Sequence, residues 1–158
     1  MRRFKYLEIA LVTILVVYTT SAMAQSKIGN ATTMILNGTC DKLTIGRQRL
    51  GDKCGSKLLN MSYPNGRVGF YFILDDGRAI TFSGMDGANP TPDTDVVDLD
   101  KVIVGIKGKP DKPKVFAASG TCKYGNPYAG ESTVICNGTM VDGQTFSASF
   151  TSDGTPPN

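Results

Sequence analysis

The chain contains no histidine among its 158 residues. Ser-His-Asp and Cys-His systems need an imidazole to take the proton from the nucleophile, so both are excluded in their usual form. Zinc catalysis through imidazole ligands is excluded for the same reason. A zinc site made of the four cysteines would need close C-x2-C pairs, which the sequence lacks. We therefore expect no metal and no cofactor.

Glutamate is almost absent as well, since Glu131 is the only one beyond residue 24. An enzyme of this composition would have to use carboxylate pairs, as glycosidases do. The candidates are Asp75, Asp76, Asp86 and Glu131. Asp76 and Asp86 each precede a glycine, which a turn explains, and Glu131 follows Gly130 as a loop residue would. We therefore expect a protein that is not an enzyme, with a carboxylate-dependent glycan hydrolase as the alternative.

A second acidic series also lacks the signature of a metal site. It consists of Asp93, Asp95, Asp98 and Asp100. Calcium takes six to eight oxygen ligands, but the EF-hand loop needs a glycine at position six and a glutamate at position twelve, and both are missing. The series is better interpreted as the polar approach to a strand that begins at Val102.

The first 24 residues have the pattern of a cleaved secretory signal. Arg2, Arg3 and Lys5 precede an apolar run at 9–18, and Ala22-Met23-Ala24 gives a small-x-small cleavage site. A membrane anchor needs about 20 apolar residues, so we expect no stable membrane insertion after cleavage. Residues 25–158 are then one domain, and we expect a periplasmic or secreted protein. Removing the signal leaves 14 basic and 13 acidic residues, a balance that gives no case for nucleic acid.

The four cysteines form two pairs with the same spacing, and each pair begins with a Gly-Thr-Cys triplet. Asn65-Gly66 and Asp76-Gly77 are also echoed 77 residues later. This repetition predicts a duplicated β unit, with copy one at about 34–84, a connection at 85–114 and copy two at 115–154. Four cysteines allow three pairings, and a duplicated unit favours local disulfides. The predicted pairs are Cys40–Cys54 and Cys122–Cys136.

The rest of the sequence predicts an all-β fold. Residues 145–151 alternate between apolar and polar side chains, and 68–74 are apolar on both faces. Further strands are expected at 34–40, 57–63, 78–83, 102–106, 115–122 and 132–141. About eight or nine antiparallel strands imply a sandwich or a small barrel. The stretches 85–95 and 107–114 are interpreted as exposed connections, and 155–158 as a disordered tail.

Glycines after Asn or Asp are expected to make the turns. Asn65-Gly66, Asp76-Gly77 and Asp142-Gly143 suit two-residue type I′ hairpins. Asn37-Gly38 and Asn137-Gly138 lie inside apolar runs beside cysteines, where a glycine predicts a β-bulge.

The loops inside the two disulfides are the predicted binding surface. The second presents Tyr124, Asn126 and Tyr128, and the first presents Arg47 and Arg49. Tyrosine is favoured at recognition surfaces, although these rings could also pack over the disulfide. We expect a non-catalytic binding protein whose partner is an envelope or extracellular protein or a glycan. A purely structural envelope protein is a further alternative.

Overall fold

The structure is a computed structural model that describes residues 26–158, so the predicted signal at 1–24 lies outside the described residues. The described chain is a closed antiparallel β-barrel of eight strands. The strands are β2 (Ala31–Ile45), β4 (Cys54–Ser62), β5 (Arg67–Leu74), β6 (Ala79–Asp86), β7 (Thr94–Ile106), β8 (Lys109–Gly125), β9 (Thr133–Met140) and β10 (Thr145–Ser152). The short strands β1 (Ser26–Ile28) and β3 (Gln48–Arg49) pair with β2, and a single 3-10 turn spans Gly51–Lys53. The all-β prediction is confirmed, and the barrel is the alternative that the chain adopts.

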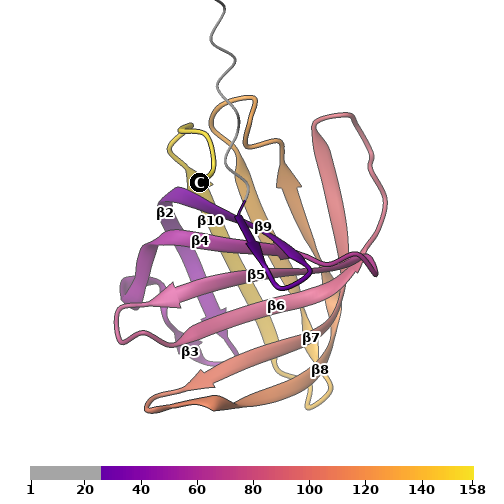
Figure 1. Cartoon of the computed structure of the whole chain (residues 1–158). Coiled ribbons are helices and arrows are strands. Elements are labelled where there is room, and N and C mark those ends of the chain that lie inside the picture. The colour runs from indigo at the N-terminus through magenta and orange to yellow at the C-terminus, as the bar shows by residue number, and fades with distance from the viewer. Residues whose placement is uncertain (1–25) are drawn as a thin grey trace, which may run out of the picture.

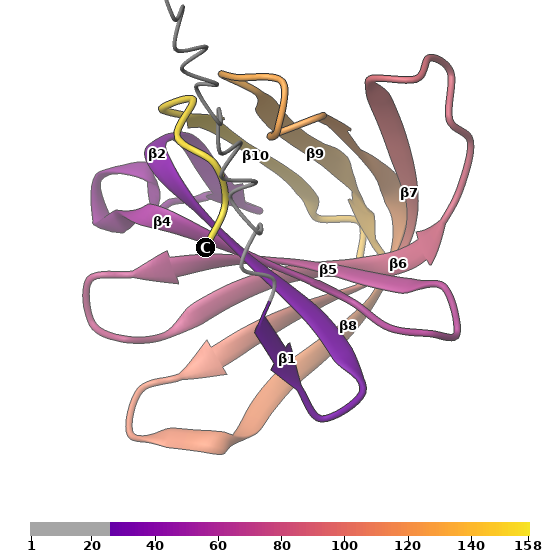
Figure 2. The ribbon, with the colours of Figure 1, turned by 45° about the horizontal axis from the view of Figure 1, so that its top comes forward.

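Each strand from β4 to β10 pairs with the next one along the chain, and β2 closes the barrel. The first half of β2, at 32–37, pairs with β4, and its second half, at 38–45, pairs with β10 (Figure 1). Figure 2 shows the same closure from nearer the barrel axis. None of the described residues belongs to a helix long and apolar enough to cross a membrane.

The barrel has two distinct ends. We call "loop end" the end that carries the connections 87–93 and 126–132 and the C-terminal segment 153–158. We call "mouth end" the opposite end, where the short connections 46–47, 75–78, 107–108 and 141–144 lie. In Figure 1 the loop end is at the top, and the tip of the β7–β8 hairpin, at the mouth end, projects at the lower left.

Apolar side chains fill the interior of the barrel. Along β5 the alternation places Val68, Phe70, Phe72 and Leu74 inside, each at most 5% exposed. Phe72 packs edge-on against Phe82, and Phe82 stacks on Phe146 with ring centroids 5.2 Å apart. A barrel of eight strands is just wide enough for its own side chains to fill it. The centre of this barrel is therefore a packed core.

Both predicted disulfides are confirmed: Cys40–Cys54 links β2 to β4, and Cys122–Cys136 links β8 to β9. Cys122 and Cys136 are directly opposite in the β8–β9 ladder. The β2–β4 ladder stops at the pair Asn37 and Lys57, and its register extended by three residues would place Cys40 opposite Cys54. Both bridges therefore follow the register of an antiparallel pair. Two disulfides are typical of an oxidising, extracellular-type compartment.

The turns differ from the predicted type I′ geometry. Among the described residues no residue other than glycine has a positive φ, whereas type I′ requires two successive positive φ values. In the β5–β6 hairpin Gly77 N–H donates to Leu74 O and Leu74 N–H donates to Arg78 O. This is a three-residue loop, a type I turn followed by a glycine bulge. The connections at 63–67 and 140–144 repeat the same two bonds, so only one residue per turn has to be glycine.

The predicted bulges at two interior glycines are also wrong. Both ladders of β9 run through Gly138 without a shift. Gly138 instead lies opposite Gly120, where a Cβ would come 2.5 Å from the Phe146 ring. In β2 the register shifts at Asp41, three residues beyond Gly38. These glycines are required by close approach between backbones and side chains.

Both predicted connections are partly strand. β7 already begins at Thr94, and Val97 and Leu99 are buried on its inner face while Asp98 is exposed. Residues 109–114 are the first part of β8 and pair with the end of β7. The tail is ordered rather than disordered, because Asn158 and Ile35 exchange two backbone hydrogen bonds and Pro157 is buried.

Candidate functional site

Tyr124 covers the core at the loop end. Its ring meets Phe70 edge-on with centroids 5.1 Å apart, and the side chain is only partly exposed. Burial raises the pKa of the Tyr124 hydroxyl above its ordinary value, and the nearby carboxylate of Asp95 raises it further. Packing on the core is the alternative role that the sequence allowed for this ring.

Asn126 and Tyr128 lie in the β8–β9 connection, next to the β6–β7 connection. The backbone N–H of Asn126 donates to the carbonyl of Asp93 at 3.1 Å, which ties the two loops together. The Asn126 Oδ1 accepts from the N–H of Tyr128, and the Tyr128 hydroxyl lies 3.4 Å from the sulfur of Met34. These three contacts therefore fix the conformation of the β8–β9 connection.

A polar recess of about 370 Å³ opens between these loops. Asp93, Asn126 and Glu131 contribute side chains to its lining, together with Ser132 and Thr133. Asp93 and Glu131 are exposed, and no ion pair of either is present among residues 26–158. Carboxylates and an amide at one opening suit ligands that bring hydrogen-bond donors or positive charge.

Arg47 and Arg49 lie at the other end of the barrel. Both are exposed: Arg47 lies in the β2–β3 turn and Arg49 in β3. In the same turn Gly46 N–H donates to Thr145 O, beside the β9–β10 turn. The fold therefore separates the two predicted loops, and no single flat surface can contain both Arg47 and Tyr128.

The mouth end has a recess of its own, of about 210 Å³. Its lining is Ile45, Gln48, Leu50, Arg78, Ile80, Val104, Lys114, Phe116, Met140 and Gln144. Ile80 and Met140 are buried at its floor, whereas Val104 and Phe116 pack on the core but stay partly exposed. Leu50, from the segment between β3 and β4, also packs on the core here, so the apolar side chains that solvent reaches are the partly exposed ones rather than the floor.

The outer wall carries a third recess, of about 430 Å³, between the β5–β6 turn and the β7–β8 hairpin. Tyr71, Ile103, Pro110 and Pro113 give it an apolar lining. The Tyr71 ring lies over Gly69, since a Cβ on that glycine would come 3.0 Å from the ring. Burial raises the pKa of Tyr71 to about 12, with a smaller contribution from Tyr63.

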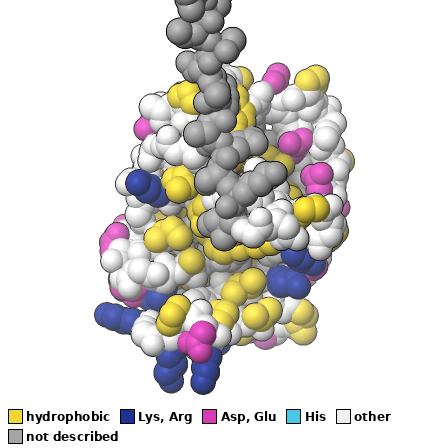
Figure 3. Space-filling view, viewed as in Figure 1, with side chains coloured by type: hydrophobic (Ala, Val, Ile, Leu, Met, Phe, Trp, Pro, Cys, Tyr) yellow, Lys and Arg dark blue, Asp and Glu magenta, His cyan; other side chains and the backbone are white. Residues whose placement is uncertain are grey.

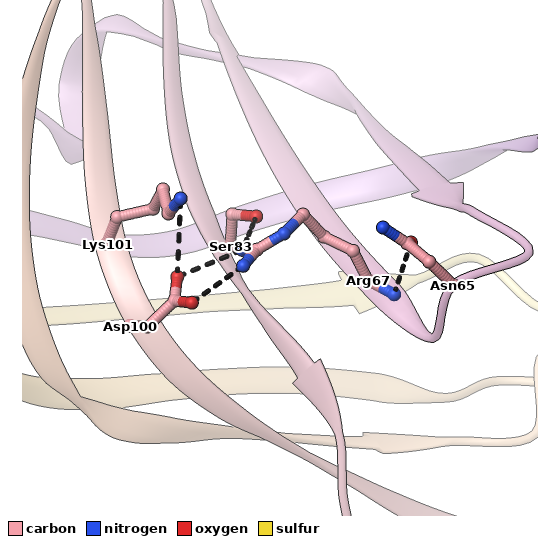
Figure 4. A network of polar contacts seen from close by, with 5 residues as sticks. All are labelled: Asn65, Arg67, Ser83, Asp100 and Lys101. Carbon is pink, nitrogen blue, oxygen red and sulfur yellow. Dashed lines mark hydrogen bonds and ion pairs between the residues drawn. The ribbon is translucent and has the colours of Figure 1, made fainter.

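A polar network on the outer wall near the loop end joins three strands (Figure 4). Arg67 on β5 makes a two-pronged contact with Asp100 on β7, at 2.9 and 2.7 Å, and also donates to Ser83 on β6 between them. Asp100 is the extra residue of a β-bulge, since Ser83 pairs with Lys101 and Gly84 with Leu99. The hydrogen bonds from Arg67 lower the pKa of Asp100. This network links β5, β6 and β7 on the outer wall and lines none of the three recesses.

The four carboxylates that the sequence offered for catalysis are divided between the two ends of the barrel. Asp75 and Asp76 are at the mouth end, where Asp76 accepts from the Nε of Arg78, whereas Asp86 and Glu131 are at the loop end. Along the acidic series, Asp95 interacts with Tyr124 and Asp100 with Arg67. Within the described part of the chain, no three Asp, Glu, His or Cys side chains are placed to hold a metal ion.

Comparison of the chain with protein-family models, with curated proteins and with solved structures finds no match.

Sequence reasoning missed the mouth recess completely. Its six apolar residues come from five strands and one connection, and each looks in sequence like an ordinary core position. The available signal was weak: Val104 and Phe116 end the inward alternation of β7 and β8 where the lysine-rich stretch begins. Only closure of the barrel brings these positions together.

Proposed function

We propose that this protein is an exported, non-catalytic binding protein whose partner is an envelope or extracellular protein or a glycan. One observation carries the proposal. The interior of the barrel is apolar and packed, whereas a polar recess opens at the loop end between two loops that are joined by a hydrogen bond. A rigid frame that presents exposed loops is a common arrangement for recognition. The two disulfides fit a periplasmic or secreted location, and the predicted signal at 1–24 agrees with it.

The contact surface that we propose is the recess between residues 87–93 and 126–132. Carboxylates of Asp93 and Glu131 accept hydrogen bonds from sugar hydroxyls as readily as from Lys or Arg of a protein. The hydrogen bond from Asn126 to Asp93 fixes the spacing of the two loops before binding. Fixing the loops beforehand lowers the entropy cost of association.

A capture experiment with two matched double variants tests the proposal. The exported protein is immobilised, incubated with the envelope and extracellular fractions of its host, and the bound protein and glycan are identified by mass spectrometry. Asp93→Asn with Glu131→Gln keeps the shape of the recess but removes its charge. Arg47→Gln with Arg49→Gln removes the same number of charges at the opposite end. Both pairs are exposed, so both variants should fold.

The expected result is loss of the partner in the first variant and full recovery in the second. Recovery of the partner by the first variant, or its loss in the second, would contradict the loop-end surface. Release of sugar from a captured glycan by the unmodified protein would contradict a non-catalytic role.

A further inference from the structure

The mouth recess combines an apolar floor with a rim that carries positive charge and no carboxylate. Of its ten lining residues six are apolar, two are cationic and two are amides. The cations are Arg78 and Lys114, and the amides are Gln48 and Gln144. An apolar pocket with a few polar groups on one side orients a ligand that has both kinds of surface.

Lys114 is the cation that is available to a ligand. It is exposed, and its ammonium has no carboxylate within ion-pair distance among residues 26–158. Arg78 is partly engaged, because Asp76 accepts from its Nε, yet no hydrogen bond of its two terminal nitrogens is present in the same part of the chain. Gln144 donates to Asp142 and so is held in place at the rim.

The surroundings reinforce the sign of this charge. Lys107, Lys109 and Lys112 are exposed on the hairpin that forms one side of the mouth, with Asp111 as its only acidic residue. Figure 3 shows Lys and Arg side chains projecting along the lower edge of the molecule, while acidic side chains stand at the upper right. Acidic side chains also lie at this end, namely Asp52, Asp75, Asp76, Asp111 and Asp142, but they are outnumbered by Arg47, Arg49, Lys53, Arg78, Lys107, Lys109, Lys112 and Lys114. The field at this end therefore favours an anion over a cation.

We infer that the mouth recess is a binding site for small amphipathic carboxylates, molecules with one anionic head group and a short apolar body. The apolar body lies on Ile80 and Met140, and the carboxylate lies at the rim between Lys114 and Arg78. This site is at the opposite end from the proposed loop-end surface and does not depend on it.

The size of the recess limits the length of the apolar body. A volume of about 210 Å³ is below the roughly 300–1,000 Å³ of ordinary ligand pockets, so the recess takes only a small apolar body. Phe72, Phe82 and Phe146 fill the barrel beneath the floor, so a longer chain cannot go deeper. The fit is therefore to short chains, and additional carbons would remain in water.

A series of straight-chain carboxylates tests the site. Butanoate, hexanoate, octanoate and dodecanoate are titrated into the purified exported protein by calorimetry, and the site is located by amide chemical shifts in NMR spectra. We expect affinity to rise about fourfold per methylene along the shorter members and to level off before dodecanoate. Shifts should appear at Leu50 and Phe116, and those at Asn126 should stay unchanged.

Two lysine variants separate a specific contact from general attraction. Lys114→Gln should weaken octanoate binding about two- to fivefold and leave binding of octanol unchanged. Lys112→Gln, two residues away on the same strand and outside the recess, should change neither. Absence of saturable binding, equal binding of octylamine and octanoate, shifts at the loop end, or equal loss in both variants would each overturn the assignment.

Discussion

At the loop end, the core of the barrel is covered by side chains and backbone, whereas at the mouth end solvent reaches apolar core residues directly. Tyr124 lies on Phe70, and buried Ser132 and Ser152 bond to each other where the β9–β10 ladder ends. At the mouth end Val104 and Phe116 extend the same inward rows and line a recess with Leu50. The two ends differ in their longer connections, which are 87–93 and 126–132 at the loop end and 46–53 at the mouth end.

The comparison shows how one barrel can carry two unlike surfaces. Strand pairing fixes both rims equally, so each end is free to differ in its connections and charges. The loop end has long polar connections with exposed carboxylates such as Asp93 and Glu131, and the mouth end has tight turns beside lysines. We propose recognition of a macromolecule at the first and of a small anion at the second.

The largest expected effect is on stability, and it differs between removal of one disulfide and removal of the other. Both span 14 residues, so the chain-entropy contribution of each is about 3 kcal/mol and is the same. Cys122 and Cys136 are fully buried, whereas Cys40 and Cys54 are only partly buried. Replacing the Cys122–Cys136 pair by alanine should therefore cost about 1–2 kcal/mol more than replacing the other, because a cavity adds to the lost entropy.

Urea unfolding of the two double variants measures this difference. Equal losses would show that the interior near the loop end repacks around the missing sulfur atoms, and that the two ends are equally tolerant.

The next effect concerns aromatic cover at the two ends. Tyr124→Ala removes an edge-on ring from Phe70 and should destabilise the protein by about 2–3 kcal/mol. Phe116→Ala at the mouth end should cost less, about 1–2 kcal/mol, because this ring has no aromatic contact within residues 26–158. Thermal and urea unfolding of both variants check the order, and a greater cost for Phe116 would contradict it.

A smaller effect is expected from the ion pair between Arg67 and Asp100 on the outer wall near the loop end. Asp100→Asn removes the charge that Arg67 binds, and since both side chains are partly exposed the cost should be about 1 kcal/mol at neutral pH. The pKa of Asp100 is lowered in the folded protein, so this stability is present above the ordinary pKa of an aspartate and is lost as pH falls.

Unfolding measured along an acid pH series tests the sign. The difference between the unmodified protein and Asp100→Asn should shrink on acidification, and a difference that persists or grows would exclude the ion pair as its source.

The smallest effect lies at alkaline pH. The pKa of Tyr71 is raised to about 12 in the folded protein, so its contribution is fully present below the ordinary tyrosine pKa of about 10 and is lost as pH rises toward 12. Tyr71→Phe should reduce the loss of stability in this range. Ultraviolet absorbance of tyrosinate, followed with pH, checks that Tyr71 ionises above the ordinary tyrosine range, and loss of the high-pH step in Tyr71→Phe assigns it. Ionisation of Tyr71 near pH 10 would contradict its burial.

Much of the fold could be predicted because it rests on local patterns. Alternation at 145–151 and the double apolar face at 68–74 identify their strands, and equal cysteine spacing identifies the disulfides. The first half of β7 was missed because Asp95, Asp98 and Asp100 mask the buried Val97 and Leu99. The turn type was missed because Asx-Gly pairs serve two-residue and three-residue loops alike, and only the backbone hydrogen bonds distinguish them.

The candidate site was predictable only as separate residues. Tyr124 was expected to share a binding surface with Arg47, yet the barrel places the two at opposite ends, because β2 runs toward the mouth end and β8 runs toward the loop end. The sequence also could not show that the ring of Tyr124 packs against Phe70, because the two residues are far apart along the chain.

The sequence by itself determined most of the strands, the disulfide partners and the absence of histidine chemistry, since each depends on residue type and short-range order. Tertiary structure alone decided that the sheet closes into a barrel and which connections meet at each end. Closure depends on one long strand, β2, that pairs with β4 through its first half and with β10 through its second. Such a division of one strand between distant partners is a cooperative outcome of packing, and it leaves no local pattern in the chain.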